Sequence, residues 1–286
     1  MGDSNLKEKV YQILTPKSAN DVILLCMAGF ILYTIVQHLI LHTFKSWFLK
    51  GNYYFPIPGK VHQLRFRNYI TGQSQPQRIK KYLDAQKATD PQKVLNKMDD
   101  FGATVEWHPS YGPEKSKITR SIIEKVTQNK SGALNVAEFG SYAGYMTVLL
   151  GSTLRNNSKM YSVEEDSEFS DISSEIFRKA GLSNCQFIND EPRSAVSTIR
   201  DLHDGQLDLV LLDVKTEEYL PTFIKLQKTG LIGKGTTVIA NNAIEPGLPD
   251  FLIYVRTAPE LFSSTLHPCR NGYDDLRDGL EEVVLL

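Results

Sequence analysis

Apolar residues in the C-terminal half of the chain form short runs that alternate with stretches of helical spacing. Five runs have the length and aliphatic content of buried parallel strands: 134–139, 159–163, 185–189, 207–212 and 235–240. The helical stretches between them begin near Tyr142, Glu168, Pro192 and Tyr219. This alternation predicts an α/β fold with a doubly wound, mostly parallel, Rossmann-like sheet that carries helices on both faces.

Further elements are expected on both sides of this unit. The pattern is helical from about Gln63 to Asn129, with amphipathic pieces at 78–83 and 94–98 separated by Pro91. After the last parallel strand, the sequence predicts a helix at 248–256 and two strands near 262–268 and 281–286 that pair antiparallel.

The N-terminal part contains an apolar stretch, residues 22–44, without Asp, Glu, Lys or Arg. As a helix it would span roughly 34 Å, enough to cross a bilayer. A buried core helix, a cleaved signal peptide and a surface helix are the alternatives, but the pattern favours a single-pass membrane anchor. The expected organisation is an N-terminal tail (1–21), the anchor (22–44), a juxtamembrane linker (45–62) and one α/β domain (63–286), with the membrane and the orientation left open.

Composition excludes some classes of function. The formal net charge of −1 gives no reason to expect a nucleic-acid partner. Three cysteines without a CxxC pair argue against a disulfide framework and a structural zinc site. The sequence names no protein partner.

Candidate chemistry gathers where the predicted strands end. Each of the five strands has oxygen-bearing side chains at its carboxyl end: Glu138, Glu164, Asp190–Glu191, Asp213 and Asn241–Asn242. Ligands of a doubly wound sheet bind beyond the carboxyl ends of its strands. Polar residues at all five ends therefore indicate a site, although one acid at a strand end is common.

The first strand–helix connection indicates the kind of ligand. Glu138 is followed by Gly140 and Gly144, and then by a helical pattern. A strand that breaks at glycine before a helix brings backbone N–H groups close to a ligand. Glu164, at the end of the second strand, is placed to hold a ribose diol. Together these features predict an adenosine-type cofactor.

The chain resembles the catechol O-methyltransferase family over most of its length, from about Gly72 to the C-terminus. The shared segments occur in family order: GQSQPQRI, VEWHPSYGPEKSKI, AEFGSYAGY, VEED, LVLLD with YLP, ANNAIEPGLPDFL and DGLEE. The resemblance implies an S-adenosylmethionine-binding fold, a Mg²⁺ ion at the strand tips and methyl transfer to a catechol, a small aromatic diol. It also implies an N-terminal anchor in the membrane-bound form.

Site residues follow from the resemblance. They are Glu138, Gly140, Tyr142, Gly144, Glu164, Glu191 and Tyr111 for the cofactor, Asp213, Asn241 and Asn242 for the metal, and Trp107 and Pro246 for the walls of the substrate pocket. Glu191 departs from the family, which has a small hydroxyl residue there.

The positions that the family uses for the metal, the general base and the catechol differ more from the family pattern. Asn241 replaces a metal-binding aspartate, so one carboxylate remains, the lower end of what Mg²⁺ uses. Thr216 replaces the general-base lysine, which leaves Lys215 as the candidate base, and Gly272 replaces the acid that clamps the catechol. Asp274 and Asp275 lie close to Gly272 in sequence.

Three hypotheses remain open. The first is a Mg²⁺-assisted O-methyltransferase that acts on a catechol-like molecule. The second is a catalytically impaired pseudoenzyme that serves as a membrane-tethered interaction protein. The third is a methyltransferase for another acceptor that uses no metal.

Overall fold

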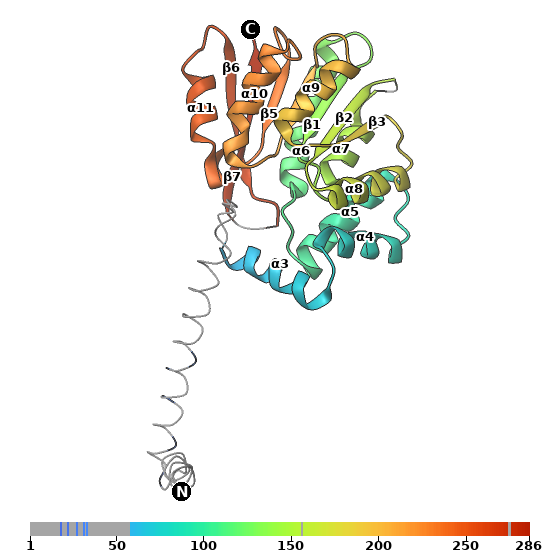
Figure 1. The fold of residues 1–286 in the computed structure, drawn as a ribbon, viewed down its shortest axis with the longest axis vertical. Helices are drawn as coiled ribbons and strands as arrows, with labels where there is room; N and C mark the ends of the chain where they lie inside the picture. The colour runs from blue at the N-terminus through green and yellow to red at the C-terminus, as the bar shows by residue number, and fades with distance from the viewer. Residues whose placement is uncertain are drawn as a thin grey trace, which may run out of the picture. The chain divides into compact units, whose positions relative to one another are not determined.

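The computed structural model describes residues 58–155, 157–273 and 276–286, together with Ser18, Val22, Met27, Ile31 and Tyr33; the side chains of 58–62 are outside this description. The chain divides into two compact units, Met1–Tyr53 and Tyr54–Leu286. The second unit contains the α/β domain (Figure 1).

A single sheet of seven strands forms the centre of this domain. The strands are β1 (Asn135–Phe139), β2 (Lys159–Glu164), β3 (Cys185–Asn189), β4 (Leu209–Leu212), β5 (Thr237–Ala240), β6 (Phe262–Arg270) and β7 (Arg277–Leu285). Their order is β3-β2-β1-β4-β5-β7-β6. Strands β1 to β5 run parallel, and β7 pairs antiparallel with both β5 and β6. The chain changes direction across the sheet between β1 and β4, which is where such folds bind ligands.

Helices cover both faces of the sheet (Figure 1). They are α3 (Pro58–Thr71), α4 (Gln75–Ala85), α5 (Pro91–Asp100), α6 (Gly112–Asn129), α7 (Tyr145–Thr153), α8 (Ser167–Lys179), α9 (Pro192–Leu202), α10 (Tyr219–Lys228) and α11 (Pro249–Arg256). Three short turns, η1 (Phe101–Val105), η2 (Thr216–Glu218) and η3 (Ala243–Gly247), connect them.

The strand sequences divide the core into two clusters. In β4, Leu209 and Leu211 pack with residues of α4 to α8, whereas Val210 and Leu212 pack with residues of α9 to α11. Successive side chains of a strand point to opposite faces, so an all-aliphatic strand supplies both clusters at once. This burial on both faces explains why the central strands carry no alternating polar residues.

The predicted strands and helices of the domain are confirmed, with shifts of a few residues at their ends. The first connecting helix starts at Tyr145 rather than near Tyr142, and α3 starts at Pro58, inside the expected linker. No helix within the described residues is long and apolar enough to cross a membrane. Most of the expected anchor, 22–44, lies outside the described residues.

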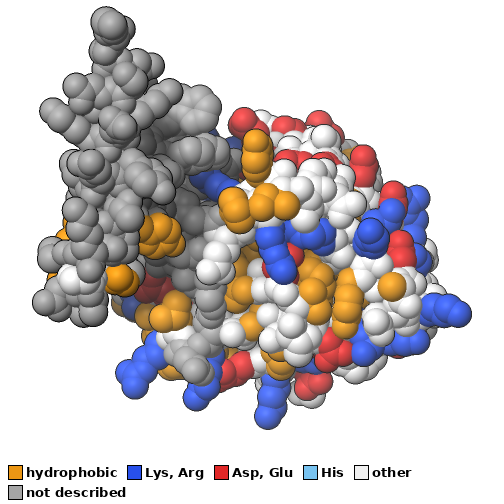
Figure 2. Space-filling view, turned by 90° about the horizontal axis from the view of Figure 1, so that it is seen from below, with side chains coloured by type: hydrophobic (Ala, Val, Ile, Leu, Met, Phe, Trp, Pro, Cys, Tyr) orange, Lys and Arg blue, Asp and Glu red, His pale blue; other side chains and the backbone are white. Residues whose placement is uncertain are grey.

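One end of the domain exposes apolar side chains. In the view from below, hydrophobic side chains lie among interspersed basic and acidic ones (Figure 2). Helix α3, at the lower end of the domain in Figure 1, exposes Phe66, Tyr69 and Ile70.

Candidate active site

The loop between β1 and α7 has the backbone that close ligand approach requires. Gly140 (φ +95°) and Gly144 (φ +81°) are both in the left-handed region, which glycine adopts at little cost. Tyr142 shares this conformation (φ +48°), which is uncommon for a side chain of its size. The loop therefore holds a strained conformation where the sequence predicts the cofactor.

Glu164 fixes this loop to the end of the neighbouring strand. Its Oε2 accepts the backbone N–H of Tyr142 at 2.8 Å, and its Oε1 accepts that of Asp166 at 3.1 Å. Burial raises the pKa of the Glu164 carboxyl group. The glycine turn and the acid, both predicted for the cofactor, are thus brought together.

A small cavity lies beside this loop. It is lined by Met98, His108, Pro109, Ser110, Tyr111, Gly140, Ser141, Tyr142, Ala143, Tyr145, Met146 and Asp213. The Ser141 Oγ and Tyr111 hydroxyl groups are buried and have no hydrogen-bond partner in the described part of the chain. Because a buried polar group without a partner costs about 1–3 kcal/mol, their presence indicates a polar ligand.

Glu138, next to the cavity at the end of β1, is fully buried. Its Oε2 accepts hydrogen bonds from Thr147 Oγ1 at 2.7 Å and Ser162 Oγ at 2.8 Å, while Oε1 has no partner among the described residues. Burial raises the pKa of Glu138 to about 8. A carboxyl group of this kind suits a ligand ammonium group, which would supply both a hydrogen bond and a compensating charge.

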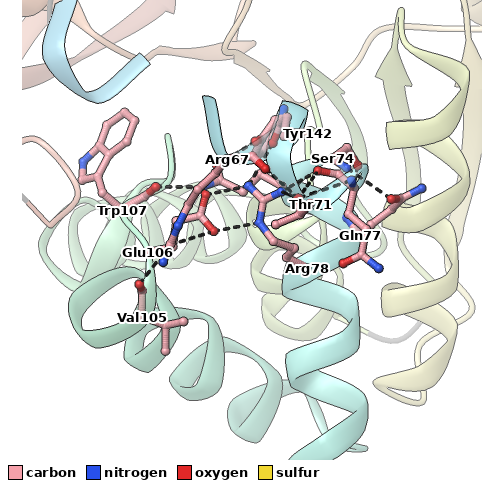
Figure 3. Close-up of polar contacts among 12 residues, drawn as sticks. Arg67, Thr71, Ser74, Gln77, Arg78, Val105, Glu106, Trp107 and Tyr142 are labelled. Atoms are coloured by element: carbon pink, nitrogen blue, oxygen red, sulfur yellow. Dashed lines mark hydrogen bonds and ion pairs between the residues drawn. The ribbon is translucent and has the colours of Figure 1, made fainter. Parts of the chain in front are cut away.

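A polar network joins the loop, through Tyr142, to α4 and to the segment that follows η1 (Figure 3). The Tyr142 hydroxyl donates to Gln75 Oε1 at 2.8 Å, and Gln75 Nε2 donates to Glu106 at 2.9 Å and to the Trp107 carbonyl at 2.8 Å. Arg78 pairs with Glu106 at 2.6 Å. Sequence reasoning assigned no role to Gln75, Arg78 or Glu106, because nothing in the pattern places them beside Tyr142.

The polar residues after β4 and β5 also meet. Asn241 Nδ2 donates to Asp213 Oδ1 at 3.0 Å, and Asn242 Nδ2 donates to Asp278 Oδ2 at 3.0 Å. Between them lies a residue that the sequence did not single out: Lys115 Nζ donates to Asn241 Oδ1 at 2.8 Å and pairs with Asp278 Oδ2 at 2.5 Å. Lys115 and Asp278 are both fully buried.

This arrangement does not fit the predicted Mg²⁺ site. Magnesium takes oxygen ligands, yet both asparagines direct an amide nitrogen at a neighbouring carboxylate. No group of three or more His, Cys, Asp or Glu side chains within the described residues is arranged to hold a metal. Burial raises the pKa of the Asp213 carboxyl group to about 6.

Four other predicted residues, Lys215, Glu191, Trp107 and Pro246, are not among the residues that line the cavity. Lys215, the candidate base, pairs with Glu165 at 2.8 Å, next to Glu164. Glu191 is exposed at the start of α9, whereas Trp107 and Pro246 are partly buried. The backbone of Gly272 packs closely against Gly112, and Asp274 and Asp275 lie outside the described residues.

Comparison with known proteins shows the family of the chain. The O-methyltransferase family profile matches residues 113–248. The chain is 32% identical over 222 residues to catechol O-methyltransferase B of Danio rerio, covering 76% of this chain and 81% of that protein. It is 27% identical over 198 residues to the transmembrane O-methyltransferase homolog of Mus musculus, covering 68% and 75% of the two chains.

Solved structures share the fold. The O-methyltransferase from Bacillus cereus in complex with SAH superposes with a TM-score of 0.57 at 17% identity, covering 68% of this chain and 90% of that one. The family match and the shared fold together place the chain in the class of S-adenosylmethionine-dependent methyltransferases. Within that class, the chain belongs to the O-methyltransferase family.

Proposed function

We propose that this chain transfers a methyl group from S-adenosylmethionine to a hydroxyl group of a small, catechol-like aromatic molecule. The observation that carries the proposal is the hydrogen bond between the glycine loop and Glu164. It lies next to a cavity whose buried polar groups have no partner among the residues that the structure describes. The relatives named catechol O-methyltransferase support an aromatic acceptor.

The chain's own residues supply binding and orientation. Glu164 is assigned to the ribose hydroxyls, and Glu138 to the amino group of the methionine part. Trp107 and Pro246 are assigned to the walls that hold the aromatic ring. The bound cofactor supplies an activated methyl group, and catalysis then depends on holding the acceptor oxygen close to it while excluding water.

The family resemblance implies that Mg²⁺ assists this reaction, but the arrangement of Asp213, Asn241 and Asn242 does not suit a Mg²⁺ ion. The proposed chemistry therefore includes no metal step. Lys215 as general base remains a prediction; its ammonium group pairs with Glu165, the residue that follows Glu164.

Membrane attachment through 22–44 is part of the proposal. It is supported by the lack of charged residues in that stretch and by the names of the transmembrane O-methyltransferase relatives. Helix α3, the first described helix after it, exposes Phe66 and Tyr69, and aromatic side chains favour membrane interfaces. Carbonate extraction of membranes from cells expressing the full chain tests this: the protein stays in the pellet if 22–44 spans the bilayer and moves to the supernatant if it does not.

Calorimetric titration of the detergent-solubilised full chain with S-adenosylmethionine, followed by a transfer assay with radiolabelled methyl groups and catechol, tests the enzymatic function. Cofactor binding with transfer supports the proposal. Binding without transfer to catechol contradicts the acceptor class, and the absence of binding favours a pseudoenzyme with an interaction role.

A further inference from the structure

The first turn of α6 places a lysine beside Asn241, one of the three residues to which the family resemblance assigns the metal ion. The Lys115 side chain is 1% exposed, and its Nζ lies 2.8 Å from Asn241 Oδ1, 2.5 Å from Asp278 Oδ2 and 3.3 Å from Asn271 Oδ1. A lysine ammonium group has three N–H donors and no acceptor. Its donors thus match three oxygen atoms supplied by three separate segments.

Asp278 holds this ammonium group firmly. Its Oδ2 accepts from Lys115 and Asn242, and its Oδ1 accepts the backbone N–H groups of Ile244 at 3.2 Å and Glu245 at 3.1 Å. A buried ion pair is stable only when its remaining hydrogen-bonding capacity is also satisfied, as it is here. The position of Lys115 is therefore fixed by the fold.

The ammonium group determines which way the Asn241 amide faces. The oxygen of the amide must face Lys115, because the amide nitrogen would place donor against donor in a buried site. The nitrogen then points at Asp213 Oδ1, 3.0 Å away. A cation bound to Asp213 would meet the N–H groups of the amide on this side, and turning the amide would break both side-chain hydrogen bonds of Asn241.

We propose that Lys115, by fixing the Asn241 amide, closes this site to divalent cations, so that methyl transfer in this protein proceeds without a metal. The inference rests on the proposed function for its catalytic part, but exclusion of the metal stands on geometry alone. In the transfer, the acceptor oxygen forms a bond to the methyl carbon with its own electron pair. The electrons of the broken carbon–sulfur bond return to sulfur, and the hydroxyl proton passes to the general base, the role proposed above for Lys215.

The proposal widens the class of acceptors from catechols to phenols. A metal ion selects catechols because it chelates two vicinal oxygens. A site without a metal has no such selection, so a phenol with a single hydroxyl group is as good an acceptor as the corresponding catechol.

Binding of Mn²⁺, followed by electron paramagnetic resonance of the free ion, tests the exclusion directly on the full chain. Wild-type protein is expected to leave millimolar Mn²⁺ free, whereas Asn241→Asp, which replaces the amide by a carboxylate facing Asp213, gains one site with at least tenfold tighter binding. Asn271→Asp is the matched control, because it adds a carboxylate beside the same ammonium group but leaves the Asn241 amide in place. No gain is expected in that variant.

Two results would overturn the inference: one Mn²⁺ bound by wild-type protein and lost in Asp213→Asn, or an equal gain in both aspartate variants. The double variant Lys115→Met/Asp278→Asn removes both buried charges together and tests, without changing Asn241, whether Lys115 fixes the orientation of its amide. A gain of Mn²⁺ binding supports this role of Lys115, and no gain in the folded variant contradicts it.

Titration with S-adenosylmethionine on the same samples keeps the two proposals apart. Cofactor binding together with wild-type Mn²⁺ binding contradicts the metal-free site only. Absence of cofactor binding by the wild-type protein contradicts the proposed function only. Where transfer is measured, the rate with EDTA should equal the rate with Mg²⁺ within twofold, for phenol and for catechol.

Discussion

The backbone of Gly140 lies against the carbonyl group of Asp213, so closely that a Cβ atom at position 140 would stand 2.0 Å from that oxygen. The contact joins the cofactor loop after β1 to the acidic residue after β4, the two strands between which the chain reverses its direction across the sheet. Only a residue without a side chain permits this approach.

Replacement of Gly140 by alanine should therefore abolish cofactor binding. The new methyl group would push the loop away from Asp213, and the positive φ adds about 1–2 kcal/mol of strain. Calorimetry with S-adenosylmethionine and thermal unfolding measure the two effects. Gly181→Ala is the control, since Gly181 also has a positive φ but open space around its Cβ position. Equal loss of binding in both variants would refute the role of close approach.

The carboxylate of Glu164 is expected to be necessary for affinity. In Glu164→Gln, the loss of one charged acceptor weakens cofactor binding by roughly 10- to 100-fold, which corresponds to about 1.5–3 kcal/mol for a hydrogen bond to a charged group. Glu165→Gln disturbs only the half-exposed pair with Lys215 and should change the dissociation constant less than fivefold. Comparable losses in the two variants would count against the assignment of Glu164 to the ribose.

Cofactor binding should release a proton from Glu138. Because its pKa is about 8 in the free protein and a ligand ammonium group favours the ionised form, affinity should rise about tenfold per pH unit between pH 6 and 7.5. Calorimetry in buffers of different ionisation enthalpy counts the proton. Glu138→Gln should bind more weakly and show no slope, and an unchanged slope in that variant would assign the proton to another group.

His108 should make the folded domain sensitive to acid. Burial lowers the pKa of His108 to about 4 from an ordinary 6.5, so between these values the unfolded chain binds a proton that the folded chain does not. Stability is unaffected by this group above pH 6.5 and falls by up to about 3 kcal/mol as the pH drops to 4.

The variant His108→Gln isolates that contribution. Its amide keeps a donor for the Met98 carbonyl, which lies 3.1 Å from Nε2 in the native protein, but it does not titrate. Urea unfolding at pH 7 and pH 4.5 should show a smaller loss of stability for the variant than for the wild type. Identical losses would assign the acid sensitivity to other groups.

The sequence by itself determined the sheet and the glycine loop that follows its first strand. Aliphatic runs such as 207–212 form central strands in any compact arrangement, because both of their faces must be buried. Gly140 and Gly144 mark the cofactor loop locally, since the left-handed backbone is a property of the residues themselves. Glu164 could be assigned because the end of a predicted parallel strand lies at a predictable edge of the sheet.

Only the tertiary structure decided which groups surround Asn241, at the predicted metal site. Lys115 and Asp278 are 163 residues apart, and neither one follows a strand of the parallel sheet. The direction of the Asn241 amide depends on that distant ammonium group, so the letter Asn in the sequence is equally compatible with a metal ligand and with a hydrogen-bond donor. Long-range packing brings the first turn of α6 against β7 and buries the Lys115 ammonium group there. Because a buried ammonium group needs oxygen atoms as partners, this packing decides that the Asn241 oxygen faces Lys115.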